Sequence, residues 1–136
     1  MKVILNKCYG GFGLSPVATM MYAKKKGVTL YPYNYDGIDD LKFIKDINDC
    51  DSVDFFFTKN YGDKVYEYHI DWTTRWCPDK NEMREDLDLI QIVEELGEKA
   101  DGRFSKLKVV EIPDTLSYVI DYYDGIETLH EDVQTW

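Results

Sequence analysis

One stretch whose residue types and spacing could do chemistry lies between Gly10 and Ser15, where a glycine-rich loop leads into a predicted helix. Ser15 followed by Pro16 is typical of a helix N-cap and first helical position. Backbone N–H groups at such a helix start can bind phosphate or another anion. The loop lacks the Gly-Lys-Ser/Thr ending of a P-loop and the glycine spacing of a dinucleotide fingerprint. Two hypotheses follow, a tight turn that packs Phe12 beneath the helix, or an anion site at Gly10, Gly11, Gly13 and Ser15.

A second candidate surface is the segment Trp72 to Trp76, which places Arg75 between two tryptophans. Tryptophan and arginine together can stack on a flat ring and pair with a phosphate or a carboxylate. Trp72, Arg75 and Trp76 are therefore candidate residues for binding a ligand or a partner. In the alternative interpretation, the tryptophans fill the core beneath an irregular connection and Arg75 covers them.

The charge of the chain is strongly acidic, with a formal net charge of −10. Lysine and arginine are absent after Lys108, whereas acids continue to Asp132. Such a surface repels duplex DNA and RNA, because affinity for them comes largely from neutralising phosphates. An acidic face can instead bind a basic partner or imitate nucleic acid, although acids also serve solubility alone. The candidate partner-binding acids are Asp121, Asp124, Glu127 and Glu131.

The remaining reactive side chains suggest no catalytic or metal centre. His69 and His130 have no cysteine or histidine at metal-ligand spacing, and the aspartates of residues 36–40 lack the calcium-loop pattern. Cys8 is expected to be a buried small hydrophobe rather than a polarised thiol. No nucleophile-and-base arrangement is readable, so we predict a protein that is not an enzyme and carries no cofactor. An odd number of cysteines and the lack of an apolar run near 18 residues favour a cytosolic protein with reduced thiols and no membrane span.

The spacing of apolar residues predicts the elements that must position these groups. Main helices are expected over about 16–26 and 86–100, and a short helix over about 40–48. Residues 32–40 are expected to form a tyrosine-rich loop. The pair Asp124-Gly125 is a strong signal for a hairpin turn between 117–123 and 126–130. The strands are expected at 2–6, 28–33, 53–58, 65–71, 106–112, 117–123 and 126–130, with 53–58 and 65–71 paired as a hairpin. Together they predict one α+β domain over residues 1–136, with a mostly antiparallel sheet.

Three stretches resemble a family of small proteins carried by bacteriophages and prophages. They are K-V-I-L-N-K-C-Y-G-G-F-G-L-S at the start, I-V-E-E-L-G-E-K-A in the predicted second main helix, and L-K-V-V-E-I-P-D with Y-D-G-I-E near the end. The likeness covers the first 27 residues and most of residues 84–136. No enzymatic activity is associated with this family, so the resemblance implies a phage accessory protein in the cytoplasm of a host cell.

A small accessory phage protein of this kind is expected to block a host defence. The first hypothesis is an inhibitor that presents acidic residues to a basic nucleic-acid channel, as some anti-CRISPR proteins do. The alternative is a sponge that encloses a cyclic or ADP-ribose-type nucleotide signal, for which the aromatic content is suited. The chain holds only three arginines, which is few for binding a highly charged cyclic nucleotide. Charge therefore favours the inhibitor, and an enzyme of unknown class is the third hypothesis.

Overall fold

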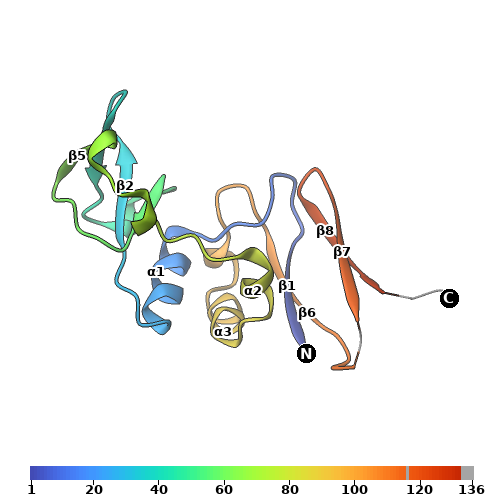
Figure 1. The fold of residues 1–136 in the computed structure, drawn as a ribbon. Helices are drawn as coiled ribbons and strands as arrows, with labels where there is room; N and C mark the ends of the chain where they lie inside the picture. Colours follow the sequence, from blue (N-terminus) through green and yellow to red (C-terminus); the bar gives the residue numbers. More distant parts are fainter. Residues whose placement is uncertain (116, 133–136) are drawn as a thin grey trace.

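Strands β1 (Lys2–Asn6) and β6 (Leu107–Glu111) pair in the middle of the molecule and separate helices from a β-hairpin (Figure 1). The computed structural model describes residues 1–115 and 117–132. Side chains alternate across the middle strands, so Ile4 packs with the helices whereas Val3 and Leu5 pack with the hairpin. The predicted α+β class is confirmed.

The helical layer consists of α1 (Pro16–Lys25), α2 (Lys80–Glu85) and α3 (Leu87–Leu96). The Ser15 side chain accepts a hydrogen bond from the Ala18 amide, as expected of an N-cap. The second main helix is interrupted at Leu96, and residues Gly97–Ala100 continue as a 3-10 turn. Buried apolar residues of α1 and α3, such as Tyr22 and Ile92, form one core with Phe12 and Met83.

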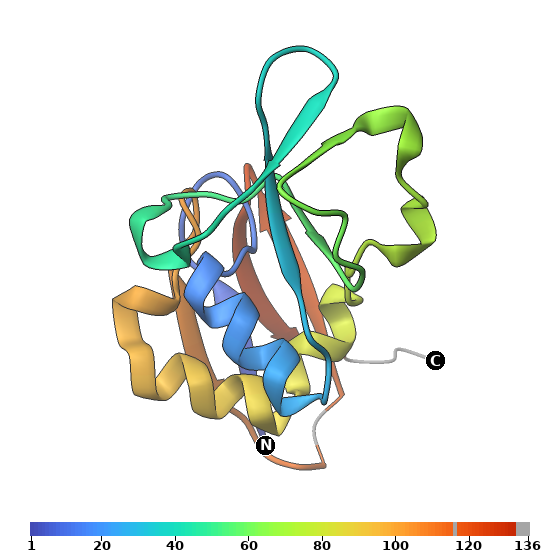
Figure 2. The ribbon, with the colours of Figure 1, turned by 90° about the vertical axis from the view of Figure 1, so that its left-hand side faces the viewer.

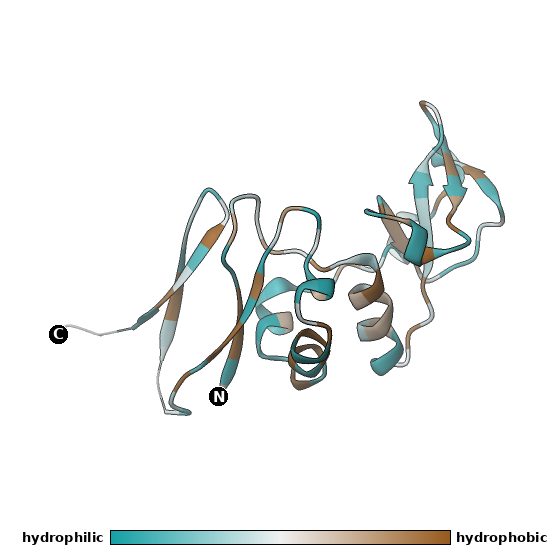
Figure 3. Ribbon diagram, turned by 180° about the vertical axis from the view of Figure 1, so that it is seen from behind, coloured by the Kyte–Doolittle hydropathy of each residue, from teal (hydrophilic) through white to brown (hydrophobic). Residues whose placement is uncertain are grey.

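The opposite layer is the hairpin of β7 (Tyr118–Tyr123) and β8 (Ile126–Glu131). Asp124 and Gly125 both have positive φ angles, of 49° and 94°, which matches the tight turn that the sequence predicts. Hydrophobic and hydrophilic residues alternate along these strands (Figure 3). Ile120 and Leu129 face the middle strands and pack against Val3 and Leu5.

Residues 31–75 form a separate part that we call the distal lobe, at the end of the molecule opposite the hairpin (Figure 1). Its strands lie in the order β4-β2-β3-β5, all antiparallel. Tyr33, Leu41, Phe57 and Ile70 are buried in its core. The strands are β2 (Tyr31–Tyr35), β3 (Asp40–Phe43), β4 (Phe55–Phe57) and β5 (Lys64–Tyr66), and the 3-10 turns are Ile47–Asp49, Glu67–His69 and Trp72–Thr74.

The middle of the chain is where sequence-based expectations were wrong. The expected loop 32–40 and short helix 40–48 are instead mostly the hairpin of β2 and β3, which turns at Gly37. Leu41 and Phe43, two residues apart, contribute to the core of the distal lobe, so alternation prevailed over the helical spacing of the apolar residues.

Two strand predictions in this region also need correction. The strand expected over 28–33 begins only at Tyr31. The segments 53–58 and 65–71 do not pair with each other, because β2 and β3 lie between β4 and β5. His69 lies in a 3-10 turn rather than on a strand face.

Candidate functional site

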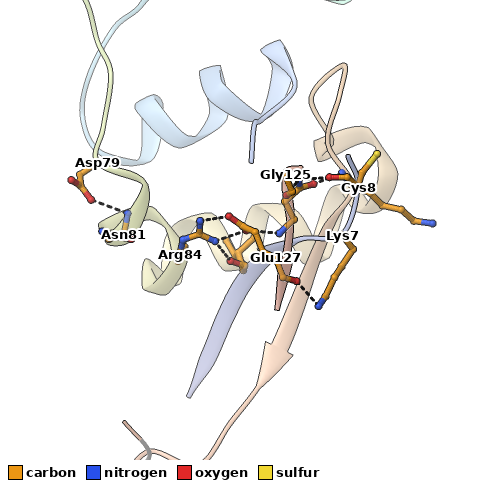
Figure 4. A network of polar contacts seen from close by, with 10 residues as sticks. Lys7, Cys8, Asp79, Asn81, Arg84, Gly125 and Glu127 are labelled. Atoms are coloured by element: carbon orange, nitrogen blue, oxygen red, sulfur yellow. Dashed lines mark hydrogen bonds and ion pairs between the residues drawn. The ribbon is translucent and has the colours of Figure 1, made fainter. Parts of the chain in front are cut away.

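A buried ion pair joins α2 to the hairpin (Figure 4) and lines a polar hollow of the main body. Arg84 Nη1 donates to Glu127 Oε1 at 2.7 Å, and Nη2 donates to Oε2 at 2.5 Å. Each residue is only 6% exposed. The guanidinium also lies over the ring of Phe12, with Cζ 4.8 Å from the ring centre. This forked geometry is the strongest arrangement available to an arginine and a carboxylate.

Local structure on both sides brings these two residues together. The Asp79 side chain accepts from the amides of Asn81 and Glu82, which starts α2 and turns Arg84 inward one turn later. On β8, Glu127 lies two residues before Leu129 and therefore shares its inward face. An acid on the apolar face of a hairpin needs a cationic partner, and this signal could have identified Glu127 from sequence.

The ion pair also covers an edge of the middle strands. Arg84 Nη1 donates to the carbonyl of Ile4 at 3.2 Å, and Glu127 Oε1 accepts from the amide of Asn6 at 2.8 Å. These are the backbone groups of β1 that point away from β6. The two side chains therefore take the place of a neighbouring strand, which prevents pairing at this edge.

Electrostatics agree with this geometry. Burial alone would raise the pKa of Glu127, but hydrogen bonds from Arg84 and the Asn6 amide outweigh it, and the pKa lies below its usual value. The nearby ammonium of Lys80 acts in the same direction. Glu127 is thus a buried carboxylate held in its charged form.

Asn6 extends the network from the ion pair to the glycine loop. Its Nδ2 donates to the carbonyls of Cys8 and Gly125, and its Oδ1 accepts from the amide of Lys106. Lys7 Nζ donates to the carbonyl of Glu127 at 2.8 Å. Asn6 is fully buried, so these bonds satisfy a side chain that would otherwise be costly to bury.

The predicted anion site is largely engaged by the protein itself. The Gly10 amide donates to the carbonyl of Asp124, and the Ser15 amide donates to that of Ala100. A Cβ atom on Gly10 would lie 2.6 Å from the carbonyl oxygen of Phe104. The loop is therefore packed between the hairpin tip and residues 100–105, which agrees with the tight-turn hypothesis. Gly11 alone of the predicted set borders the polar hollow.

The four predicted acids of the hairpin do not share one surface. Asp121 faces outward and forms an ion pair with His130 at 3.2 Å, whereas Asp124 lies in the turn. Glu131 lies opposite Tyr118 at the far end of the hairpin. The expectation that Glu127 belongs to an exposed acidic surface is wrong, because alternation turns it into the core beside Arg84.

The predicted Trp72–Trp76 segment is divided between the two parts of the molecule. Trp72 packs edge-on against Phe55 in the distal lobe, with ring centres 5.0 Å apart. Trp76 instead packs against Tyr22 of α1, with ring centres 5.6 Å apart. Arg75 is exposed above the ring of Phe55. The interpretation in which the tryptophans fill the core therefore holds only for Trp76, which packs partly buried against the helical core, whereas Trp72 is 41% exposed.

Sequence reasoning missed a surface that we call the tyrosine rim, at the projecting end of the distal lobe (Figure 2). Ile38, at the β2–β3 turn, is 91% exposed, and Tyr68 is 74% exposed and stacks on Tyr66. The Tyr35 hydroxyl donates to Glu67, whose amide donates to the carbonyl of Asp39. The rim consists of Tyr35, Asp36, Ile38, Asp39, Asp54, Tyr66, Glu67 and Tyr68.

Two adjoining hollows follow one side of α2. The first has a volume of about 460 Å³ and is lined by Gly11, Lys80, Asn81, Arg84, Tyr122 and Glu127, among others. The second, of about 640 Å³, is lined by residues that include Asn81, Glu85, Ser117, Tyr118 and Asp132. The Tyr118 hydroxyl donates to Glu85, and burial together with this bond raises the pKa of Tyr118 to about 12. We call the two together the α2 groove.

The chain matches no protein-family model, no curated protein and no solved structure. Within the described residues, no helix is long and apolar enough to cross a membrane. Over the same residues, no three histidine, cysteine or acidic side chains are arranged to hold a metal ion. The candidate surfaces therefore rest on geometry and charge alone.

Proposed function

We propose that the chain is a non-enzymatic binding protein that inhibits a basic, nucleic-acid-binding protein of a host defence system. The observation that carries this proposal is the tyrosine rim. There, exposed aromatic side chains such as Tyr66 and Tyr68 lie among carboxylates. The neighbouring β2–β3 hairpin projects from the molecule (Figure 2).

The amino-acid composition of the tyrosine rim suits a basic protein partner. Tyrosine supplies a large, stiff contact area and is enriched among residues that dominate binding energy. Residues 31–75 hold 10 acids against 5 lysines and arginines, a net charge of −5. Acidic rims accelerate association with basic surfaces and select against acidic partners. The rim would occupy a channel that otherwise holds nucleic acid.

The resemblance to phage proteins supplies the biological setting. Its motifs cover the main body of the chain, whereas the rim lies in the part that the resemblance leaves out. A shared body that carries a variable binding lobe suits inhibitors of different host proteins. Under this proposal, the distal lobe determines which defence protein is bound.

A nucleotide sponge is the second candidate, and the placement of the arginines speaks against it. Arg84 is neutralised by Glu127, Arg75 lies over Phe55, and Arg103 lies over Phe104. These arginines are not gathered around one hollow that could enclose phosphates. Lys80 and Tyr122 beside the α2 groove are the features that favour a nucleotide.

The test of the inhibitor uses the immobilised chain and lysate from bacteria that carry defence systems. We expect it to capture a basic nucleic-acid-binding protein, to release it as salt rises, and to release it when duplex DNA is added. Asp36→Lys combined with Asp39→Lys should abolish capture. The matched control, Glu98→Lys with Glu111→Lys, changes the net charge equally at exposed sites outside the distal lobe and should retain it.

Three results would contradict the proposal in different ways. Equal loss in the control pair would mean that only overall charge matters. Loss restricted to Asp121→Lys with Asp124→Asn would move the binding surface to the hairpin. A rise in melting temperature with a cyclic or ADP-ribose-type nucleotide, without capture of any basic protein, would favour the sponge instead.

A further inference from the structure

We propose that the α2 groove binds an extended peptide, which adds as a strand to the open edge of β7. This goes beyond the proposed function, because it concerns a second surface, on the main body. The inference begins with the backbone of the hairpin rather than with its side chains.

Alternation of hydrogen bonds shows which backbone groups of β7 face outward. Tyr123 and Ile126 flank the two-residue turn and pair directly across it. In such a hairpin, Tyr123, Asp121 and Val119 exchange hydrogen bonds with β8, and the residues between them do not. The N–H and C=O groups of Tyr118, Ile120 and Tyr122 therefore point to the other edge of β7.

Those outward groups lack partners within the described residues. No strand among residues 1–115 and 117–132 pairs with this edge of β7, and no hydrogen bond there involves the backbone of Tyr118, Ile120 or Tyr122. Other edges of the main body are covered at some positions. Arg84 and Glu127 cover β1, Lys7 bonds the Glu127 carbonyl of β8, and Asp101 accepts from the amide of Leu107 on β6.

The residues of the open edge also line the α2 groove. Ile120 and Tyr122 line the first hollow with Lys80, while Tyr118 and Ile120 line the second with Glu85. A strand paired with β7 would lie about 4.8 Å from it and would direct alternate side chains into the hollows. Peptide recognition by strand addition works in this way, with backbone bonds for affinity and hollows for selectivity.

Charges along the groove define the chemistry of the peptide. In the first hollow, Lys80 forms no ion pair with any described residue, whereas Arg84 is neutralised by Glu127. The second hollow presents Glu85 and Asp132, and the terminal amine of Met1, which also lines it, is paired with Asp114. The peptide should therefore carry an acid opposite Tyr122 and a lysine or arginine opposite Tyr118.

Strand direction sets the order of these two residues. Antiparallel pairing is somewhat more stable per residue than parallel pairing. An antiparallel peptide passes Tyr122 first and Tyr118 four residues later. The occupant we infer is an extended segment of a partner protein with an acid followed, four residues on, by a basic residue.

The test uses the acetylated and amidated peptide Thr-Glu-Thr-Val-Thr-Lys-Thr with the isotope-labelled full chain. At saturation, amide hydrogen exchange should slow about tenfold or more at Tyr118, Ile120 and Tyr122. Exchange at Val119, Asp121 and Tyr123 should be unchanged, because their amides already bond to β8. Slowing at both sets, or at neither, would overturn the proposal.

Two control peptides test the backbone and the charges separately. One carries N-methyl groups on its Glu, Val and Lys nitrogens, and the other exchanges the Glu and Lys positions. Both should bind at least about fivefold more weakly, because the first lacks the donors that face β7 and the second places like charges together. Equal binding of either peptide would refute the corresponding part of the inference.

Substitutions at Tyr122 test the same backbone contacts by changing the chain instead of the peptide. Tyr122→Pro removes an outward N–H without removing a bond to β8, and the Tyr122 ring is 78% exposed, so its loss opens no core. This variant should lose peptide binding, and Tyr122→Thr, which keeps the N–H, should retain most of it. Asp36→Lys with Asp39→Lys should leave peptide binding unchanged, which separates this site from the tyrosine rim.

Discussion

The main body and the distal lobe hold their strands together by different means. In the main body, buried polar groups connect the layers, with Arg84 and Glu127 bonded to each other and to the backbone of β1. In the distal lobe, aromatic rings connect the strands, and Tyr33 contacts Phe43, Phe57 and Tyr61 edge-on. Polar networks require particular partners, whereas apolar packing tolerates exchange if volume is kept. The distal lobe is therefore the part that can change its surface most easily.

The largest effect should come from breaking the buried ion pair. Arg84→Met leaves Glu127 buried without its cation and removes the donor to Ile4, so we expect a loss of about 3–5 kcal/mol in the free energy of unfolding. Urea denaturation measures it. Arg75→Met is the matched control, since Arg75 is exposed above Phe55, and should change stability by less than about 1 kcal/mol. Similar values for both variants would show that the ion pair does not hold the layers together.

A cavity in the distal core should have a somewhat smaller and more local effect. Leu41 is fully buried, so Leu41→Ala should cost about 3 kcal/mol. If the two parts differ as described, amide exchange should accelerate in β2 and β3 far more than in β1 and β6. Equal acceleration throughout would show that the molecule unfolds as one unit and would weaken the comparison.

Two glycines with almost the same φ angle allow the cost of backbone strain to be distinguished from the cost of steric overlap. Gly125 in the main body has φ of 94° and Gly37 in the distal lobe has φ of 95°. A Cβ atom on Gly125 would meet the Gly11 nitrogen at 2.4 Å, whereas one on Gly37 would meet nothing within 4 Å. Gly125→Ala should therefore destabilise the protein by about 2 kcal/mol more than Gly37→Ala, as measured by thermal unfolding. Equal losses of stability in the two variants would mean that the hairpin tip shifts to accommodate the added Cβ atom at little cost.

The smallest expected effect is a change in stability that occurs only at acidic pH. Because the folded-state pKa of Glu127 lies below the ordinary value of 4.5, its contribution to stability is complete above that pH and is lost as pH falls through the lowered pKa. The stability difference between the native chain and Glu127→Gln should be constant near neutral pH and shrink in this acid range. Denaturation curves between about pH 2 and 7 test this, and a difference that grows toward low pH would contradict the assignment.

Local patterns predicted the main body well for identifiable reasons. Ser15-Pro16 begins α1 and Asp124-Gly125 forms the hairpin turn, because capping and positive φ are properties of a few neighbouring residues. In the distal lobe, Leu41 fits both an alternating and a helical pattern. Whether such a segment forms a strand or a helix depends on the strand that it can pair with. That strand lies elsewhere in the chain, so no local pattern reveals it.

Of the candidate site, sequence identified residue types but not their surroundings. The sequence predicts that Glu127 lies on an exposed acidic surface, and it predicts no role for Arg84. The two residues are 43 positions apart in the chain, yet they are in contact in the structure. Trp72 and Trp76 were treated as one surface, yet they pack in different parts of the molecule. The tyrosine rim was missed because Tyr35, Tyr66 and Tyr68 come together only through the pairing of β2, β3 and β5.

The sequence by itself determined the α+β class, the starts of α1 and α3, the hairpin turn and an acidic, aromatic-rich surface. These depend on short-range geometry and on totals of charge and ring area, which do not change when the chain folds. Only the tertiary structure decided which acids are buried, which strand edges are covered and where the tyrosines gather. Those properties depend on contacts between residues far apart in the chain, such as Arg84 with Glu127, where the free energy of burying a charge depends on a distant partner.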